Sequence, residues 1–155
     1  MAVEGSGLID TSVVIALPRV LDASALPATP LICAVTLAEL SVGSLVATSE
    51  DERASRQAVL QQAEADFEPL PFDAAAARAF GRVAASLRRS GRKPQARAFD
   101  AMIAAVAVTQ GLPLYTCNPR DFAGIDGLAV VAVVAVAAGG SDVTDGRLEG
   151  ATAPP

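Results

Sequence analysis

The chain has 155 residues, of which 52% are hydrophobic and 19% charged, and its formal net charge is −5. This length and composition predict one globular domain rather than a disordered polymer. The absence of histidine excludes Ser-His-Asp and Cys-His triads and nearly all zinc chemistry. Cys33 and Cys117 lie far apart and form no disulfide or metal-binding pattern, which predicts a reducing, cytoplasmic environment.

The sequence predicts no membrane partner. Its first residues are acidic and glycine-rich rather than cationic. The longest apolar run, from Leu128 to Ala138, is shorter than the roughly 20 residues that span a bilayer. We expect residues 1–137 to form the domain and residues 138–155 to form a disordered tail.

Short apolar runs alternate with helical segments along the chain. The pattern predicts strands at 8–9, 31–35, 67–72, 114–116 and 128–133, and helices at 11–17, 36–47, 49–66, 73–89 and 96–110. Strands that alternate with helices favour right-handed βαβ units. We therefore expect an α/β fold, a three-layer α/β/α sandwich around a central, mostly parallel sheet.

Acidic side chains follow several of the predicted strands. Asp10 follows the first strand, and Glu39 lies about one turn into the helix after the second. Asp100 lies near the start of an otherwise apolar helix, and Asn118 and Asp121 follow the strand at 114–116. Because ligands bind at the carboxyl ends of parallel strands, we expect these side chains to share one edge of the sheet.

Each acidic residue also has a purely structural explanation. Asp10 is a suitable cap for the following helix, and Asp100 would stabilise the positive end of its own helix. Thr36 and Glu39 have the spacing of a capping box. The polar pair after the strand at 114–116 is ordinary turn sequence. None of these positions predicts a site when it is taken alone.

Taken together, the acids predict a cation site. Asp10 and Asp100 are embedded in apolar sequence and are expected to be largely buried, where an unpaired carboxylate is costly. Several acids in one cavity repel one another unless a cation neutralises them. An all-oxygen ligand set selects Mg²⁺ or Mn²⁺ over zinc. Such a cluster is suited to metal-assisted hydrolysis of a phosphodiester.

A basic strip interrupts the acidic balance of the chain. No acid occurs between Ala74 and Phe99, although this segment holds most of the positive charges. The alternative to nucleic-acid binding is a solvated helix face whose last arginines favour the helix dipole. We expect contacts with nucleic-acid phosphates from Arg88, Arg89, Arg92, Lys93, Arg97 and Arg120.

Four segments, in order, resemble the PIN-domain ribonucleases, and within them the VapC toxins of bacterial toxin–antitoxin modules. They are Leu8–Leu17, Leu37–Leu40, Phe99–Ala105 and Leu114–Phe122. The resemblance implies a PIN-like sandwich and a Mg²⁺- or Mn²⁺-dependent endoribonuclease. It also implies a cognate VapB-type antitoxin, with a homodimer or a toxin–antitoxin hetero-oligomer as the assembly.

Carried over by position, the resemblance assigns Asp10, Glu39 and Asp100 to the metal site, and Thr11 to the small polar position after the first acid. A fourth position falls in a T-x-N-x-x-D-F motif. In this motif Thr116 supports the site, and either Asn118 or Asp121 is the fourth catalytic residue. An amide at this position would bind a metal only weakly, which leaves the number of metals open.

Other functions fit acids at strand ends less well. A receiver-like signalling domain needs an acidic pair in the first loop and a lysine at a strand end, whereas Lys93 lies in a loop. A haloacid-dehalogenase-type phosphatase needs the pattern D-x-D-x-T, and the segment that begins at Asp10 lacks the second aspartate. Within the family that the chain resembles, the alternative is an RNA-processing nuclease without an antitoxin.

Overall fold

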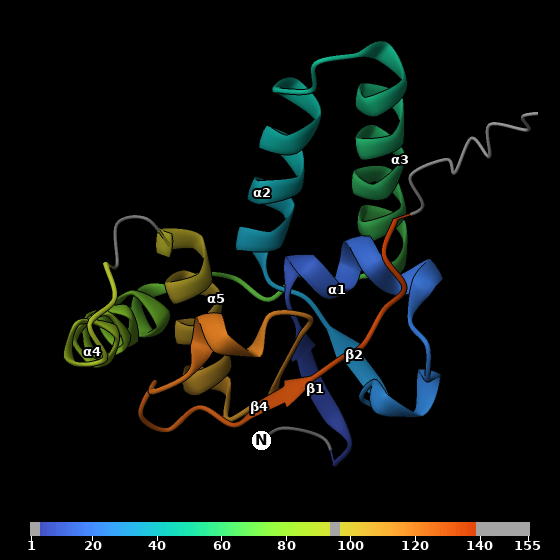
Figure 1. Ribbon diagram of the computed structural model, residues 1–155. Coiled ribbons are helices and arrows are strands. Elements are labelled where there is room, and N and C mark those ends of the chain that lie inside the picture. Colours follow the sequence, from blue (N-terminus) through green and yellow to red (C-terminus); the bar gives the residue numbers. More distant parts are fainter. Residues whose placement is uncertain (1–3, 94–96, 139–155) are drawn as a thin grey trace, which may run out of the picture.

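The structure, a computed structural model, describes residues 4–93 and 97–138. Four strands form a sheet in the order β2-β1-β3-β4, and each neighbouring pair is parallel (Figure 1). The central strands are β1 (Ser6–Ile9) and β3 (Leu114–Thr116), and the edge strands are β2 (Thr29–Leu31) and β4 (Val130–Ala132). The predicted α/β fold with a parallel sheet is confirmed. The predicted tail, apart from residue 138, lies outside the described residues.

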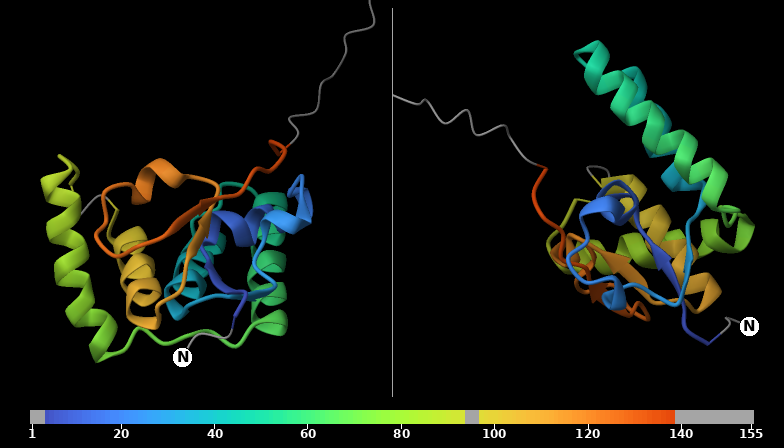
Figure 2. Two further views of the ribbon diagram at one scale, coloured as in Figure 1. Left: turned by 90° about the horizontal axis from the view of Figure 1, so that it is seen from below. Right: turned by 90° about the vertical axis from the view of Figure 1, so that its right-hand side faces the viewer.

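Helices cover both faces of the sheet because successive residues of a strand point to opposite faces. Leu8 packs in a core with α4 (Ala74–Arg89) and α5 (Ala98–Gln110). Ile9 packs in a second core with α1 (Thr11–Ala16). In Figure 2, α4 lies along the outer side of α5, so the first core is covered by a pair of helices. The result is the expected three-layer arrangement.

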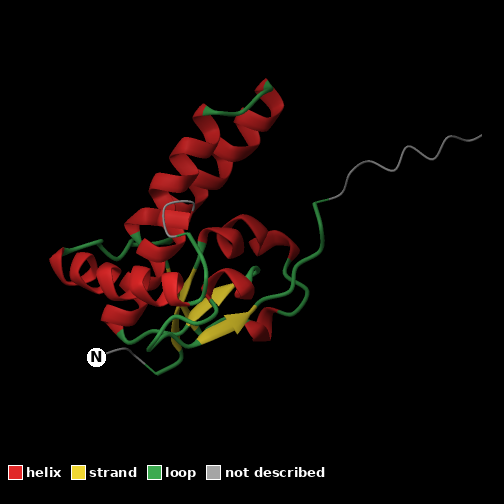
Figure 3. Ribbon diagram, turned by 60° about the vertical axis from the view of Figure 1, so that its left-hand side comes forward, coloured by secondary structure: helices red, strands yellow, loops and turns green. Residues whose placement is uncertain are grey.

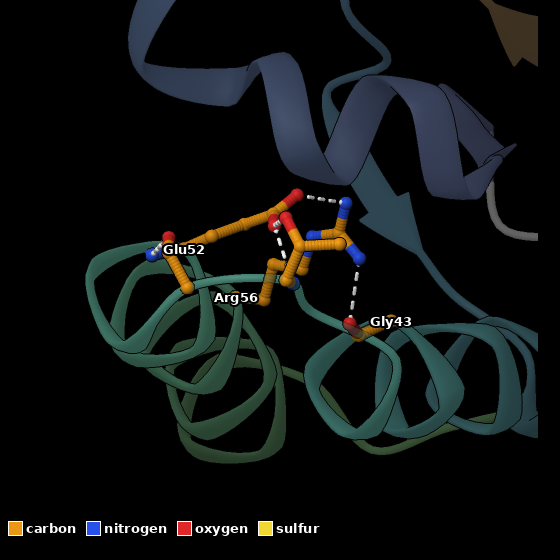
Figure 4. A network of polar contacts seen from close by, with 5 residues as sticks. Gly43, Glu52 and Arg56 are labelled. Atoms are coloured by element: carbon orange, nitrogen blue, oxygen red, sulfur yellow. Dashed lines mark hydrogen bonds and ion pairs between the residues drawn. The ribbon is translucent and has the colours of Figure 1, made fainter.

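Helices α2 (Ala34–Leu45) and α3 (Glu50–Asp66) form a hairpin that projects from the sandwich (Figure 3). A polar clamp holds the two helices together near the outer end of the hairpin (Figure 4). Arg56 donates to the carbonyl oxygen of Gly43 at 2.7 Å and pairs with Glu52 on its own helix. The clamp fixes the position of α2, which carries one of the predicted site residues.

Several elements differ from the sequence prediction, and three of the differences exceed the fraying of an end. The strand predicted at 31–35 ends at Leu31, and α2 begins at Ala34 rather than at residue 36. The strand predicted at 67–72 does not form, because its two prolines remove ladder donors, and only Leu70 makes a bridge, to Cys33. β4 is shorter than the predicted 128–133.

Both cysteines are free thiols, which agrees with the absence of a disulfide pattern. Over residues 4–93 and 97–138, no helix is long and apolar enough to cross a membrane.

Candidate active site

Four carboxylates gather at the carboxyl ends of the two central strands. Asp10 follows β1, and Asp121 lies in the short 3-10 helix Pro119–Phe122 that follows β3. Glu39 comes from α2 and Asp100 from the first turn of α5. The negative charges of the other three carboxylates each raise the pKa of Asp100, so the four groups share one electrostatic environment. The structure thus brings together Asp10, Glu39 and Asp100, which the sequence predicts, with Asp121, one of its two alternatives for the fourth position.

Asp10 is 4% exposed, and both of its carboxylate oxygens are fixed by hydrogen bonds. Oδ1 accepts from the backbone N–H of Val13 at 3.0 Å and from the hydroxyl of Ser12 at 2.5 Å. Oδ2 accepts from the hydroxyl of Thr116 at 2.6 Å. Asp10 therefore does cap α1. Since a carboxylate has about four lone-pair positions, this cap leaves room for a cation.

Glu39 is not part of a capping box. The N-cap of α2 is Cys33, so Thr36 lies inside the helix and Glu39 more than a turn from its start. Instead, the hydroxyl of Thr11 donates to Oε1 of Glu39 at 2.7 Å. Burial raises the pKa of Glu39, and the charge of Asp10 raises it further. The capping explanation is thereby excluded, and Thr11 has the supporting position that was expected of it.

The carboxylate of Asp100 has a strongly raised pKa. Burial raises its pKa to about 6, and the charges of Glu39, Asp121 and Asp10 contribute in that order. The guanidinium of Arg97 partly offsets this rise. Carboxylates that disfavour one another's ionised form have a strong preference for a cation between them.

The geometry favours Asp121 over Asn118 as the fourth residue of the site. Asp121 is half-buried and its charge acts on Asp100, whereas the side chain of Asn118 is exposed. Asn118 contributes through its backbone, whose N–H donates to the hydroxyl oxygen of Thr116 at 3.0 Å. That contact orients the Thr116 hydroxyl toward Asp10.

Ser12 is a site residue that the sequence pattern does not single out. Besides its bond to Asp10, its hydroxyl oxygen accepts from the backbone N–H of Cys117 at 3.0 Å. Ser12 therefore ties the end of β1 to the end of β3. Its only signal in the sequence is a short hydroxyl side chain two residues after a strand-end aspartate.

The residues present suit a magnesium or manganese ion that keeps several of its waters better than an ion coordinated by protein ligands alone. Among the described residues, no three His, Cys, Asp or Glu side chains form a ready-made ligand group. Mg²⁺ usually keeps several waters and binds through one or two carboxylates. Oxygen-only donors that repel one another suit this mode of binding.

The model of the PIN domain family matches residues 8–128, which include all four carboxylates. The chain belongs to the PIN-domain family.

Similarity to VapC proteins places the chain in the VapC branch of the family. It is 44% identical to Ribonuclease VapC5 of Mycobacterium tuberculosis over 133 residues, which are 84% of this chain and 96% of that protein. It is 36% identical over 97 residues to tRNA(fMet)-specific endonuclease VapC of Shigella flexneri, over 63% of this chain and 70% of the relative. The crystal structure of VapBC-5 from Mycobacterium tuberculosis matches with a TM-score of 0.71 and 39% identity, over 83% of this chain and 98% of that one. The PIN-like fold is thus confirmed.

The basic residues of the predicted strip differ from one another in exposure and in ion pairing. Arg88 and Lys93 are exposed, and Arg92 is half-buried. Arg89 is exposed but pairs with Asp126 at 2.5 Å. Because α4 ends next to the start of α5, the strip lies on the side of the PIN domain from which Asp100 comes (Figure 2).

The two remaining predicted RNA contacts have different surroundings. Arg120 is exposed in the 3-10 helix that also holds Asp121, at the edge of the carboxylate group. Arg97 pairs with Asp121 and thus lies among the carboxylates rather than on the open strip.

Two hollows lie on the side of the α2–α3 hairpin, and one of them reaches the carboxylates. One has a volume of about 380 Å³ and is lined by Glu39 and Thr11 together with Arg56 of the clamp. The other has a volume of about 460 Å³ and lies between α1 and α3, with a largely apolar lining that includes Val14 and Val59. Both share Ile15 in their walls, so they form neighbouring parts of one surface.

Proposed function

We propose that this chain is a Mg²⁺- or Mn²⁺-dependent endoribonuclease and the toxin of a VapBC-type toxin–antitoxin module. The observation that carries the proposal is the group of four carboxylates at the edge of a PIN-domain sheet, where three of them raise the pKa of the fourth. The names of its relatives, a ribonuclease and a tRNA(fMet)-specific endonuclease, support RNA as the substrate class. A structural relative that is a member of the VapBC toxin–antitoxin family supports the biological role.

Asp10, Glu39 and Asp100, with Asp121 as the fourth acid, would hold the metal. A bound divalent ion supplies a water of lowered pKa as nucleophile and neutralises the charge that develops on the phosphate. The chain's own contribution is to hold the acids in place. Hydroxyl and backbone donors fix Asp10, and Thr11 fixes Glu39. Ligands that are buried and hydrogen-bonded in this way are already oriented before the ion binds.

Purified protein tests this proposal through its metal requirement. We expect RNA cleavage to stop in excess EDTA and to return when Mg²⁺ or Mn²⁺ is added beyond the chelator. The chain has no histidine that could activate a nucleophile in place of the ion. Cleavage that continues at full rate in EDTA would contradict the metal-dependent mechanism.

The basic strip provides a second prediction, about RNA affinity. Neutralising two exposed residues, as Arg88→Gln together with Lys93→Gln, is expected to weaken RNA binding. Each lost phosphate contact should reduce the slope of log affinity against log salt by roughly 0.7 for single-stranded RNA. The measurement is RNA affinity at several salt concentrations.

Arg53→Gln is the matched control for this charge change. Arg53 is also exposed and basic, but it lies on α3 and pairs with Glu50. We expect this variant to keep the parental slope. If the double variant also keeps the parental slope, the strip is a solvated helix face that does not bind RNA.

The partner proposed for this toxin is a VapB-type antitoxin that covers the hairpin side of the domain. Ile15, Val42, Leu45 and Val46 are exposed there, although they are large and apolar. Large apolar side chains that are exposed together favour an interaction site. Because the hollow lined by Glu39 continues into this surface, a bound partner would also reach the carboxylates. A second copy of the chain is the other candidate for the same surface.

A further inference from the structure

Arg97 brings a positive charge into the group of carboxylates. Its guanidinium pairs with Asp121 and lies 3.9 Å from the carboxylate of Asp100. Both acids are mostly buried at their side chains, with 29% and 30% exposure. The charge of Arg97 also lowers the pKa of Asp100, against the effect of burial and of the other acids. Arg97 thus acts on two of the proposed metal ligands at once.

The position of Arg97 is not explained by its own helix. Arg97 is the N-cap residue of α5, and its side chain makes no capping hydrogen bond. A cation at a helix N-terminus is unfavourable, because the helix dipole is positive there. The neighbouring carboxylates supply the attraction that outweighs this cost.

Two of the other arginine pairs among the described residues differ from this one in the exposure of their acids. Arg53 pairs with Glu50 and Arg89 with Asp126, and both of these acids are largely exposed, at 87% and 78% of their side chains. Exposed pairs of this kind contribute little free energy. Arg97 instead compensates acids that repel one another, so its removal leaves an excess of negative charge.

We propose that Arg97 is a built-in counter-ion that competes with the divalent metal for Asp100 and Asp121. The inference rests on the proposed function, since it concerns the same metal site. Guanidinium and metal neutralise the same two carboxylates, so the metal binds only as the Arg97 pair loosens. Arg97 therefore sets how much divalent ion is needed to load the site, and it stabilises the acidic edge when metal is scarce.

The test is calorimetric titration of the purified protein with Mn²⁺ alone. Arg97→Gln keeps a polar side chain but removes the charge. We expect this variant to bind Mn²⁺ about three- to fivefold more tightly, which corresponds to an ion pair of up to about 1 kcal/mol. Arg97→Lys keeps the charge and should bind Mn²⁺ within about twofold of the parent. The Arg53→Gln variant, which also loses one positive charge, should leave the affinity unchanged.

A second readout is thermal stability without and with Mn²⁺. Metal-free Arg97→Gln should melt below the parent, and saturating Mn²⁺ should raise its melting temperature by more than it raises that of the parent. Arg97→Ala should also bind Mn²⁺ more tightly and melt lower without metal than the parent. Agreement between the two variants shows that the effect comes from the lost charge and not from the introduced glutamine. Equal or weaker Mn²⁺ binding by both neutral variants would overturn the competition, even if cleavage stays metal-dependent. A parent protein that binds no Mn²⁺ and cleaves RNA in EDTA would overturn the proposed function as well.

Discussion

Asp100→Asn is expected to lower the rate of RNA cleavage by more than about a hundredfold while the protein stays folded. Changing a residue that only supports a metal ligand typically costs 10- to 100-fold, so loss of a ligand charge should cost at least as much. Asparagine has the size of aspartate, and Asp100 is half-buried rather than sealed in the core. The measurement is the initial cleavage rate at saturating Mg²⁺.

The same variant should be more stable than the parent at neutral pH in the absence of metal. The pKa of Asp100 is raised from 3.8 to about 6, so the folded protein holds this proton more tightly than the unfolded chain does. Stability therefore falls as the pH rises from about 4 through 6, and the cost is fully present above 6. Asparagine carries no charge, which should remove a cost of about 1–2 kcal/mol at pH 7.

Asp51→Asn is the control for both effects, because Asp51 is exposed on α3. Its cleavage rate should match that of the parent, and its stability at pH 7 should not rise, because Asp51 lies in the first turn of α3, where the helix dipole favours a carboxylate. An Asp100→Asn protein that keeps half of the parental rate would show that Asp100 is a structural acid. A loss of stability at pH 7 would show that the negative charge of Asp100 is already compensated by neighbouring groups in the folded protein.

Thr116→Val is expected to reduce cleavage by roughly 10- to 100-fold and to lower the free energy of unfolding by about 1–3 kcal/mol. Thr116 is fully buried, and its hydroxyl donates to Oδ2 of Asp10 while it accepts from the N–H of Asn118. Valine has the same shape but no hydroxyl. It leaves a buried carboxylate oxygen without its donor, so Asp10 is held only through Oδ1, by Ser12 and Val13.

Thr109→Val provides the matched control for this substitution. The hydroxyl of Thr109 donates to the carbonyl of Ala105 within α5 at 2.7 Å, near the end of the helix that is remote from Asp100. Cleavage rates and urea unfolding of both variants give the comparison. Equal activity of the two would mean that the Thr116 hydroxyl is not needed to hold Asp10 in place.

Much of the fold could be predicted because its determinants are local. Alternating apolar runs and helical periods indicate a parallel sheet, and Gly111 ends α5 in the left-handed conformation that favours glycine. The start of α2 could not be predicted in this way. Residues 31–35 are a short apolar run, and such a run fits a buried strand as well as the first turn of a buried helix.

The acids of the candidate site could be predicted because parallel topology forces the strand ends together. Their partners could not, because pairing depends on how side chains turn across loops. Arg97 shows this: its charge suggests an RNA contact, yet its nearest partner is Asp121, more than twenty residues away in the sequence. The choice between Asn118 and Asp121 likewise depends on which side chain points inward.

The chemical ends left by RNA cleavage test the central claim most directly, which is that the carboxylates direct a metal-activated water at the phosphodiester. Mass spectrometry of a short RNA cut in the presence of Mg²⁺ identifies these ends. We predict a 5′-phosphate on one fragment and a 3′-hydroxyl on the other, because water attacks the phosphorus and the ribose 2′-hydroxyl takes no part. A 2′,3′-cyclic phosphate would contradict the account, because it forms only when the 2′-hydroxyl is the nucleophile.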